Sequence, residues 1–531
     1  MQQYAILIGL LIVAIPLLGI ARRFAVPYPI VLVIGGLVLG FVPGLELPLD
    51  PQAVLLLALP PLLYWESVTA PTDDMIANAS WIWPLAIGLV LATTAIVAVV
   101  MHAVVPGLTW AVAFVLGAVV APTDEIAAVP IAERLGVPRH VVSIIDGEAL
   151  FNDAVSLILY ATGVAVVVTG SFSLPLTMLQ LAGSAVGALV IGMLAGRLAV
   201  SAWRRFRDTE LQTLVSVLLP FVAYAPANAL HASGVLAVIV AGIYVNRWTP
   251  IVMRPSTRLR TIGWWNTTVF LVNVVLFTVL GMQLHSIVSH ALLRHSWSEL
   301  LVDALVLNVA IIIVRVAWIY GQAAVPGVRV SAHPGSDWRH TAVIAMSGLR
   351  GAISLAAALG IPVTIGSHAA FPERDLIVFL TFTVIVVTLV GGGLVLPIAI
   401  RALRLPAGTE EGAAELRLAM RAALEAALST LDAAETHGEI AREDAQVLRG
   451  RYQRELNRFE ESATTADARR LRAFTEIQRR VLNAELTAVV ALRLAGKIDN
   501  TVLRDVVGRL DLRQAQLDHV SDFLPDAQDE E

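Results

Sequence analysis

The chain has 531 residues, of which 57% are hydrophobic and 15% charged, with a formal net charge of −5. Soluble domains carry about 25% charged residues, so this composition excludes an ordinary water-soluble protein. The chain contains no cysteine, which excludes disulfides, thiol catalysis and cysteine-ligated metals. Many apolar runs reach about 18 residues, the length at which a helix crosses roughly 30 Å of hydrocarbon. The sequence therefore predicts an all-α polytopic membrane protein.

The apolar runs predict about thirteen membrane-spanning helices. They lie near residues 4–20, 28–43, 51–68, 81–105, 108–131, 143–168, 174–200, 211–230, 234–247, 264–285, 299–320, 340–363 and 375–400. The first run ends in Arg22 and Arg23, whereas a signal peptide carries its positive charge before the apolar run. We therefore expect a retained first span.

The loop arginines predict the orientation of the chain. Nearly all of them fall on one side of the thirteen-span arrangement, and the other side has only Arg294 and Arg374. Since positive residues collect in the cytoplasm, the N-terminus is expected outside and the C-terminus inside. Lys497 is the only lysine beside many arginines, a usage that fits a GC-rich bacterium. The expected location is a bacterial plasma membrane, crossed many times.

Two predicted spans carry residues that break helices. The fifth, "GAVVAPTDEIAAVPIAERLG", contains Pro122 and Pro130, and the twelfth, "AMSGLRGAISLAAALGIP", contains Gly348 and Gly351. Irregular backbone at membrane depth is tolerated only where it is buried or lines a cavity. Paired broken spans at matching places in two halves are typical of a transporter's binding site. The pattern predicts two inverted six-helix repeats with two crossing broken helices.

The sixth span carries Glu148, Asn152 and Asp153 in the stretch "EALFNDAVSLILY". Ionisable residues inside a membrane are costly, and their default interpretation is functional. A carboxylate in a low-dielectric cleft can hold a proton or a cation, and loading one expels the other. Glu148 and Asn152 share a helix face, and Asp153 points about a quarter turn away. We expect Asp153 to be the ion and proton carrier, and Asn152 to tie this helix to the broken span.

Three residues of other spans are candidates to support the ion. Thr123 can offer a hydroxyl or carbonyl oxygen to a hard monovalent cation because the fifth span is unwound there. Asp124 follows it, with a water-filled vestibule as the alternative interpretation. Glu66, in "LPPLLYWES", is either a further carboxylate of the site or a residue at the end of the third span.

A structural ion pair is expected between Glu148 and Arg350 of the twelfth span. An unpaired arginine at that depth would be very costly, and a pair would lock the two broken regions to the sixth span. Arg315 of the eleventh span is expected to extend toward the membrane surface instead.

The composition changes abruptly after residue 404. The remaining stretch, 405–531, is rich in Ala, Leu, Glu and Arg at helical spacing. It predicts a cytoplasmic helical tail domain that packs against or regulates a transmembrane exchanger domain at 1–404.

The motifs resemble those of the sodium/proton antiporters of the first monovalent cation:proton antiporter family. "DGEALFNDAVSLILY" is similar to the family's Asn-Asp signature, and four further landmarks follow the family's order: "APTDEIAAVPIAERLGVP", "SGVLAVIVAGIYVNR", "LGMQL" and "GLRGAISLAAALGIP". The resemblance covers roughly residues 1–404. It implies thirteen spans, a homodimer with a fixed scaffold, and a moving six-helix core that alternates access like an elevator.

Residue by residue, the resemblance implies a role for each candidate. Asp153 matches the ion- and proton-binding aspartate, and Asn152 matches its structural neighbour. Thr123 and Asp124 match the unwound pair of the crossing helix. The resemblance also implies the Glu148–Arg350 pair and, in some members, a carboxylate like Glu66.

The chain departs from the family pattern at two positions. Ala149 stands where many bacterial relatives have a serine whose hydroxyl helps to bind the ion, and Asn228 stands where relatives often have glutamate. Both departures concern cation preference, and neither concerns Asp153.

The predicted function is secondary active exchange of Na⁺ or Li⁺ for H⁺, which is electroneutral if Asp153 alone titrates, and which serves pH homeostasis. The alternatives are K⁺/H⁺ exchange in the same fold and, in a different class, a cation channel or sensor gated by the tail. An enzyme is not expected, since the sequence has no HExxH, GxSxG or cysteine motif. No cofactor and no nucleic-acid partner is expected; the partners are the transported ions, the lipid bilayer and a second copy of the chain.

Overall fold

The computed structural model describes residues 2–23, 27–41, 56–171, 174–325, 337–365, 369–403 and 409–461. It also describes residues 477–478, 480–489, 491–492, 497, 506–507, 509–510 and 512–514. The chain divides into two compact units, residues 1–408 and 409–531. The expected boundary at 404/405 and the start of the third expected span, 51–55, lie outside the described residues.

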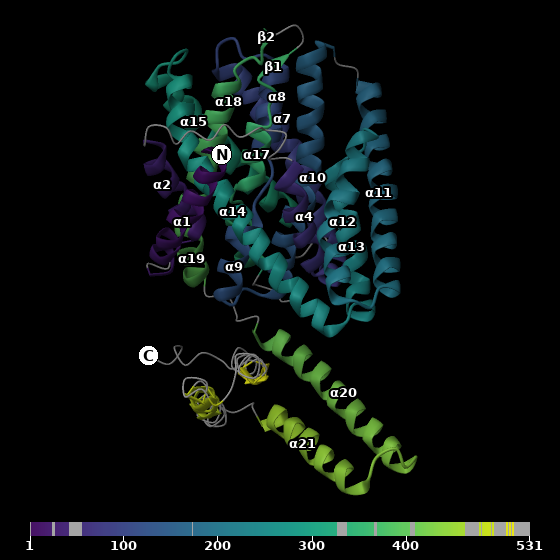
Figure 1. The fold of residues 1–531 in the computed structure, drawn as a ribbon. Helices are drawn as coiled ribbons and strands as arrows, with labels where there is room; N and C mark the ends of the chain where they lie inside the picture. The colour runs from purple at the N-terminus through teal and green to yellow at the C-terminus, as the bar shows by residue number, and fades with distance from the viewer. Residues whose placement is uncertain are drawn as a thin grey trace. The chain divides into compact units, whose positions relative to one another are not determined.

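Among its described residues, the first unit consists of helices, their connecting loops and one pair of two-residue strands (Figure 1). Its first half contains α1 (Gln2–Arg23), α2 (Tyr28–Gly40), α4 (Leu59–Thr69), α5 (Thr72–Ala77), α6 (Ala79–Trp83), η1 (Pro84–Leu89), α7 (Val90–Val104), α8 (Trp110–Val120), α9 (Glu125–Arg134) and α10 (Arg139–Thr169). Its second half contains α11 (Leu174–Arg205), α12 (Thr209–Ala229), α13 (Gly234–Val252), α14 (Pro255–Ala291), α15 (Trp297–Ala323), α16 (Asp337–Met346), α17 (Ala352–Leu359), α18 (Arg374–Val386), η2 (Val387–Gly391) and α19 (Gly392–Leu403). The strands β1 (Thr364–Ile365) and β2 (Ala369–Ala370) pair antiparallel, Thr364 opposite Ala370.

Eight helical stretches among the described residues are long and apolar enough to cross a membrane. They are Ala79–Val104, Arg139–Thr169, Leu179–Arg205, Thr209–Ala229, Gly234–Val252, Pro255–Ala291, Trp297–Ala323 and Arg374–Leu403. The prediction of an all-helical polytopic membrane protein is confirmed. The count of thirteen spans and the inverted repeats stay predictions.

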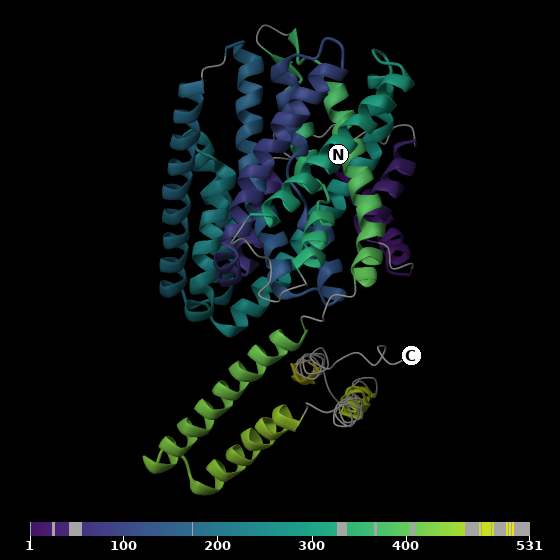
Figure 2. The same cartoon turned by 180° about the vertical axis from the view of Figure 1, so that it is seen from behind.

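Close helix packing in the first unit depends on glycine. Gly36 of α2 and Gly281 of α14 face each other, and a Cβ on either would overlap a backbone carbonyl, that of Thr278 or of Val33. Small residues let membrane helices approach closely, since helix association in lipid relies on packing contacts. A second group, α11, α12 and α13, stands together on the other side of the unit in both views (Figures 1 and 2).

Two helices are interrupted where the sequence predicts broken spans. The first break, residues 121–124, separates α8 from α9, and the second, residues 347–351, separates α16 from α17. Pro122 lacks the N–H that would continue α8, and glycines weaken the helix at the second break. The helices that flank the two breaks, α8, α9, α16 and α17, all pack against α10.

The second unit contains a helical hairpin of α20 (Thr409–Thr436) and α21 (Arg442–Glu461). Gly438 has φ +71° and makes the turn after α20. Arg449 of α21 donates hydrogen bonds to Asp432 and, at 2.8 Å, to Glu435 of α20. These hydrogen bonds raise the pKa of Arg449.

Candidate cation site

The long helix α10 positions three polar side chains in the interior of the membrane unit. Glu148 and Asn152 are each 1% exposed, and Asp153 is 4% exposed. A water-exposed helix end is therefore excluded as an interpretation of Glu148. Because successive residues turn by about 100° around a helix, Asp153 faces a different neighbour from Glu148 and Asn152.

A chain of hydrogen bonds joins α10 to the first break. Asn152 Nδ2 donates to Thr123 Oγ1 at 2.7 Å, and Thr123 Oγ1 donates to Glu148 Oε1 at 3.3 Å. The amide of Asn152 thus ties the helix to the broken span, as expected from its position beside Asp153. The Thr123 hydroxyl donates one hydrogen bond and accepts another in this network, and a hydroxyl of this kind keeps one further lone pair.

The expected pair between Glu148 and Arg350 is wrong, because Arg315 of α15 occupies that place. Arg315 Nη1 donates to Glu148 Oε1 at 2.6 Å, and Nη2 donates to Oε2 at 3.1 Å. Arg315 also donates to the carbonyls of Ile344 and Ala345, at 2.8 and 3.0 Å, at the end of α16. One guanidinium therefore joins α15, α10 and the second broken helix.

The reason for this error is the depth of Arg315 in its helix. The sequence placed the end of the eleventh span at residue 320, close enough for an arginine to reach the surface. The helix continues to Ala323, eight residues and about 12 Å beyond Arg315. Gly348 gives room for the buried guanidinium, since a Cβ there would overlap Arg315.

Arg350 lies at the second break and is 1% exposed. Its backbone N–H donates to Thr388 Oγ1 in η2 at 3.0 Å. Its Nε and Nη1 have no hydrogen-bond partner among the described residues, although the charges of Glu148 and Asp153 are within electrostatic range. Among the described residues no ion pair of this guanidinium is found, and its charge acts on Glu148 and Asp153 over a longer range.

The two breaks contact each other directly. The Asp124 N–H donates to the carbonyl of Leu349 at 2.8 Å. The Asp124 carboxylate packs against Gly351, where a Cβ would overlap it. Asp124 and Gly351 immediately precede α9 and α17, whose N-terminal ends carry partial positive charge that favours an anion.

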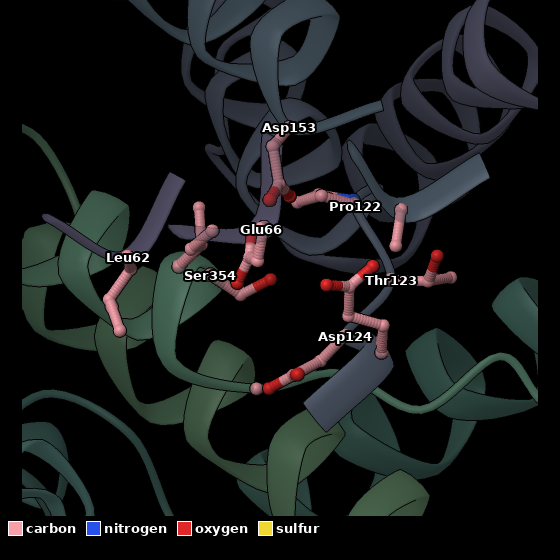
Figure 3. Close-up of a pocket in the computed structure, with 11 residues that line it drawn as sticks. Leu62, Glu66, Pro122, Thr123, Asp124, Asp153 and Ser354 are labelled. Atoms are coloured by element: carbon pink, nitrogen blue, oxygen red, sulfur yellow. The ribbon is translucent and has the colours of Figure 1, made fainter. Parts of the chain in front are cut away.

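A small cavity lies between the breaks, α4 and α10 (Figure 3). Its free volume is about 20 Å³, enough for about one water-sized occupant. Its walls are formed by Leu62, Glu66, Pro122, Thr123, Asp124, Glu125, Ala149, Asp153, Gly351, Ile353 and Ser354. The structure therefore brings Asp153, Thr123, Asp124 and Glu66 to one place. Asn152, Glu148 and Arg350 are not in the cavity wall.

Three buried oxygen atoms of the cavity wall have no hydrogen-bond partner among the described residues. They are Oε2 of Glu125, Oδ1 of Asp153 and Oγ of Ser354. In Figure 3, Asp153, Glu66 and Ser354 lie next to one another, with Thr123 on the other side. A carboxylate oxygen in such a cavity can take a proton or bind a cation. Sequence reasoning missed Ser354, although it lies three residues after Gly351 in the second broken span.

Comparisons with known proteins agree on one family. The model of the transmembrane part of sodium/hydrogen exchangers matches residues 7–402. The chain is 33% identical to an uncharacterised Na⁺/H⁺ exchanger of Mycobacterium bovis, over 94% of this chain and 93% of that protein. It is 31% identical to a sodium, potassium, lithium and rubidium/H⁺ antiporter of Bacillus subtilis, over 74% of this chain and 60% of that protein.

The fold is also similar to a solved structure. The sodium proton antiporter MjNhaP1 of Methanocaldococcus jannaschii superimposes with a TM-score of 0.61 at 18% sequence identity. The match covers 76% of this chain and 99% of that one. At 18% sequence identity, this similarity concerns the fold alone.

Proposed function

The chain belongs to the sodium/hydrogen exchanger family, and from this premise we propose that it exchanges Na⁺ or Li⁺ for H⁺ across a bacterial plasma membrane. Asp153 is the carrier in this proposal. The observation that carries it is the Asp153 carboxylate, 4% exposed, whose Oδ1 faces an oxygen-lined cavity and has no hydrogen-bond partner among the described residues. A cation and a proton compete for binding to this carboxylate.

The competition couples the two fluxes. When a cation binds the ionised carboxylate, its charge disfavours protonation, and when a proton binds, the neutral acid loses its attraction for the cation. One cation replaces one proton at Asp153, so the exchange is electroneutral when Glu66 and Asp124 keep the same charge in both loaded states. Thr123 supplies a backbone oxygen to Na⁺, and Asp124 and Glu66 keep the cavity attractive to cations.

Alternating access follows from how the breaks are joined. The Asp124–Leu349 hydrogen bond and the Glu148–Arg315 pair connect both broken helices to α10. We propose that these elements move as one body against a fixed scaffold, carrying the cavity from one side of the membrane to the other. The homodimer of such scaffolds, the outside N-terminus and the cytoplasmic C-terminus belong to the same proposal.

Potassium is the second candidate cation. The relative from Bacillus subtilis is named as an antiporter of sodium, potassium, lithium and rubidium, which favours broad cation use in this family branch. Cavity size and ligand number decide between small and large cations, so the ions must be compared in one preparation.

The test is proton movement in proteoliposomes containing the purified full chain. An acid-inside gradient is imposed, NaCl, LiCl, KCl or choline chloride is added outside, and internal pH is recorded. We expect Na⁺ and Li⁺ to dissipate the gradient in the wild-type protein, and Asp153→Ala to abolish the response. Equal potency of K⁺ would establish the second candidate, and a well-folded protein that moves no protons with any cation would refute exchange.

The proposed orientation has a separate test. The natural chain lacks cysteine, so a single cysteine introduced at Ser298 or at Arg449 can be labelled without a background. We expect an impermeant thiol reagent to label the Ser298 variant from outside intact cells and the Arg449 variant only after lysis. The reverse pattern would invert the topology.

A further inference from the structure

Ser354 presents a buried hydroxyl to the cation cavity. The residue lies in the first turn of α17, is 2% exposed, and forms part of the cavity wall together with Asp153 and Glu66. Its Oγ has no hydrogen-bond partner among the described residues. A buried hydroxyl without a partner is costly, so its position in the wall needs an explanation.

Ala149 lies in the same wall, on the α10 side, and contributes only a methyl group. The cavity therefore receives no hydroxyl from this position of α10, and the Thr123 hydroxyl already makes two hydrogen bonds, one donated to Glu148 and one accepted from Asn152. A cation that enters a site of this size leaves its water behind, and oxygen atoms of the protein must replace that water. Among the described residues of the wall, Ser354 is the one with an uncommitted hydroxyl oxygen.

We propose that Ser354 is a cation ligand, and that the second broken helix supplies the hydroxyl that residue 149 of α10 lacks. The site is then shared by Asp153 on α10, Glu66 on α4, Thr123 in the first break and Ser354 on α17. This inference rests on the proposed exchange function, because it assigns a ligand to the ion that is exchanged. It also makes the second broken helix part of the cation's own coordination.

The test is an exchange of hydroxyl positions between Ser354 and Ala149. Wild type, Ser354→Ala, Ala149→Ser and the double variant are reconstituted, and the Na⁺ and Li⁺ concentrations for half-maximal proton release are measured. We expect Ser354→Ala to raise the half-maximal Na⁺ concentration about tenfold, the effect of losing one ligand hydrogen-bonding group. The double variant is expected to recover most of that loss, since residue 149 faces the same cavity.

Two controls separate a ligand from a packing residue. Ser354→Thr keeps a hydroxyl and should keep the wild-type Na⁺ dependence. Ser67→Ala removes a buried hydroxyl that donates to Leu63 of its own helix and lies outside the cavity wall, so it should not change Na⁺ dependence. The Na⁺-induced rise in melting temperature gives a binding readout independent of transport, and it should shrink in Ser354→Ala.

The outcomes distinguish this inference from the function it rests on. If the wild-type protein shows no Na⁺-driven proton movement, the proposed function fails. If the wild-type protein exchanges Na⁺ and Ser354→Ala has the same half-maximal concentration and the same Na⁺-induced stabilisation, only the inference about Ser354 is overturned. If Ser354→Ala does not fold, Ala149→Ser decides: an added hydroxyl ligand should lower the half-maximal Na⁺ concentration, and no change would overturn the inference.

Discussion

Two carboxylates on the same helix have opposite surroundings. Glu148 and Asp153 are both buried in α10, five residues apart. Both oxygens of Glu148 accept hydrogen bonds, from Arg315 and Thr123, whereas Oδ1 of Asp153 accepts none from the part of the chain that the structure describes. The helix thus has two faces. The locked face, Glu148 and Asn152, is hydrogen-bonded to its neighbours, and the open face, Ala149 and Asp153, lines the cavity.

On α10, Glu148 has a structural role and Asp153 has a transport role. A buried charge is tolerated when an opposite charge and further hydrogen bonds compensate for its lost hydration, as Arg315 does for Glu148. A group that must bind and release an ion cannot be compensated in that way, because its partner would compete with the ion. The locked face should therefore control folding, and the open face should control exchange.

The largest expected effect on stability is at Arg315. Arg315→Met leaves the Glu148 carboxylate buried without its partner, and we expect a loss of about 3–5 kcal/mol in the free energy of unfolding. Denaturation of the purified protein in detergent measures it. Adding Glu148→Gln to this variant should recover part of the loss.

Arg350→Met is the matched control for Arg315→Met. Arg350 is equally buried but makes no side-chain ion pair with Glu148. We expect a smaller loss of stability than for Arg315→Met. A larger loss at Arg350 would mean that Arg350, not Arg315, is the partner of Glu148 in the membrane.

The next largest effect is expected where the two breaks meet. Gly351→Ala would place a methyl group on the Asp124 carboxylate, and overpacking of this kind costs about 1–3 kcal/mol. Because Asp124 also lines the cavity, exchange should slow as well. A variant with unchanged stability and unchanged Na⁺ dependence would show that the breaks do not pack as described.

A smaller effect is expected for the amide of the locked face. Asn152→Ala removes the donor to Thr123, and such hydrogen bonds within membranes contribute about 0.6–1.7 kcal/mol. A double-variant cycle with Thr123→Val measures the coupling between the two residues. Strictly additive losses would argue against the Asn152–Thr123 hydrogen bond.

The smallest effect is expected in the helical hairpin of the second unit. Arg449→Ala removes exposed ion pairs with Asp432 and Glu435, and surface pairs contribute little to stability. We expect exchange at saturating Na⁺ to be unchanged in proteoliposomes. A clear change in the pH dependence of exchange would instead show that the hairpin regulates the membrane unit.

The sequence predicted the parts of the site that local chemistry determines. Pro122, Gly348 and Gly351 lie at the two breaks, where proline removes a backbone N–H and glycine weakens the helix. An aspartate in the middle of an apolar span is costly and is by default interpreted as functional. The identity of the partner of Glu148 depends on how α10 and α15 pack, and neither sequence segment contains that information.

The role of Ser354 was hidden for a related reason. A serine in an apolar helix commonly donates to its own backbone, as Ser67 does. Only the cavity, which is formed by four separate segments, distinguishes the hydroxyl of Ser354 from such a serine.

The most direct test of the central claim compares stability and exchange in Asp153→Asn. Asparagine keeps the size of the side chain and removes the titrating charge, so Na⁺-driven proton movement should disappear. The melting temperature should stay at or above that of the wild-type protein, because a buried and incompletely bonded carboxylate is replaced by a neutral group. Persistent Na⁺-driven proton movement in this variant, or loss of exchange through unfolding alone, would contradict the account.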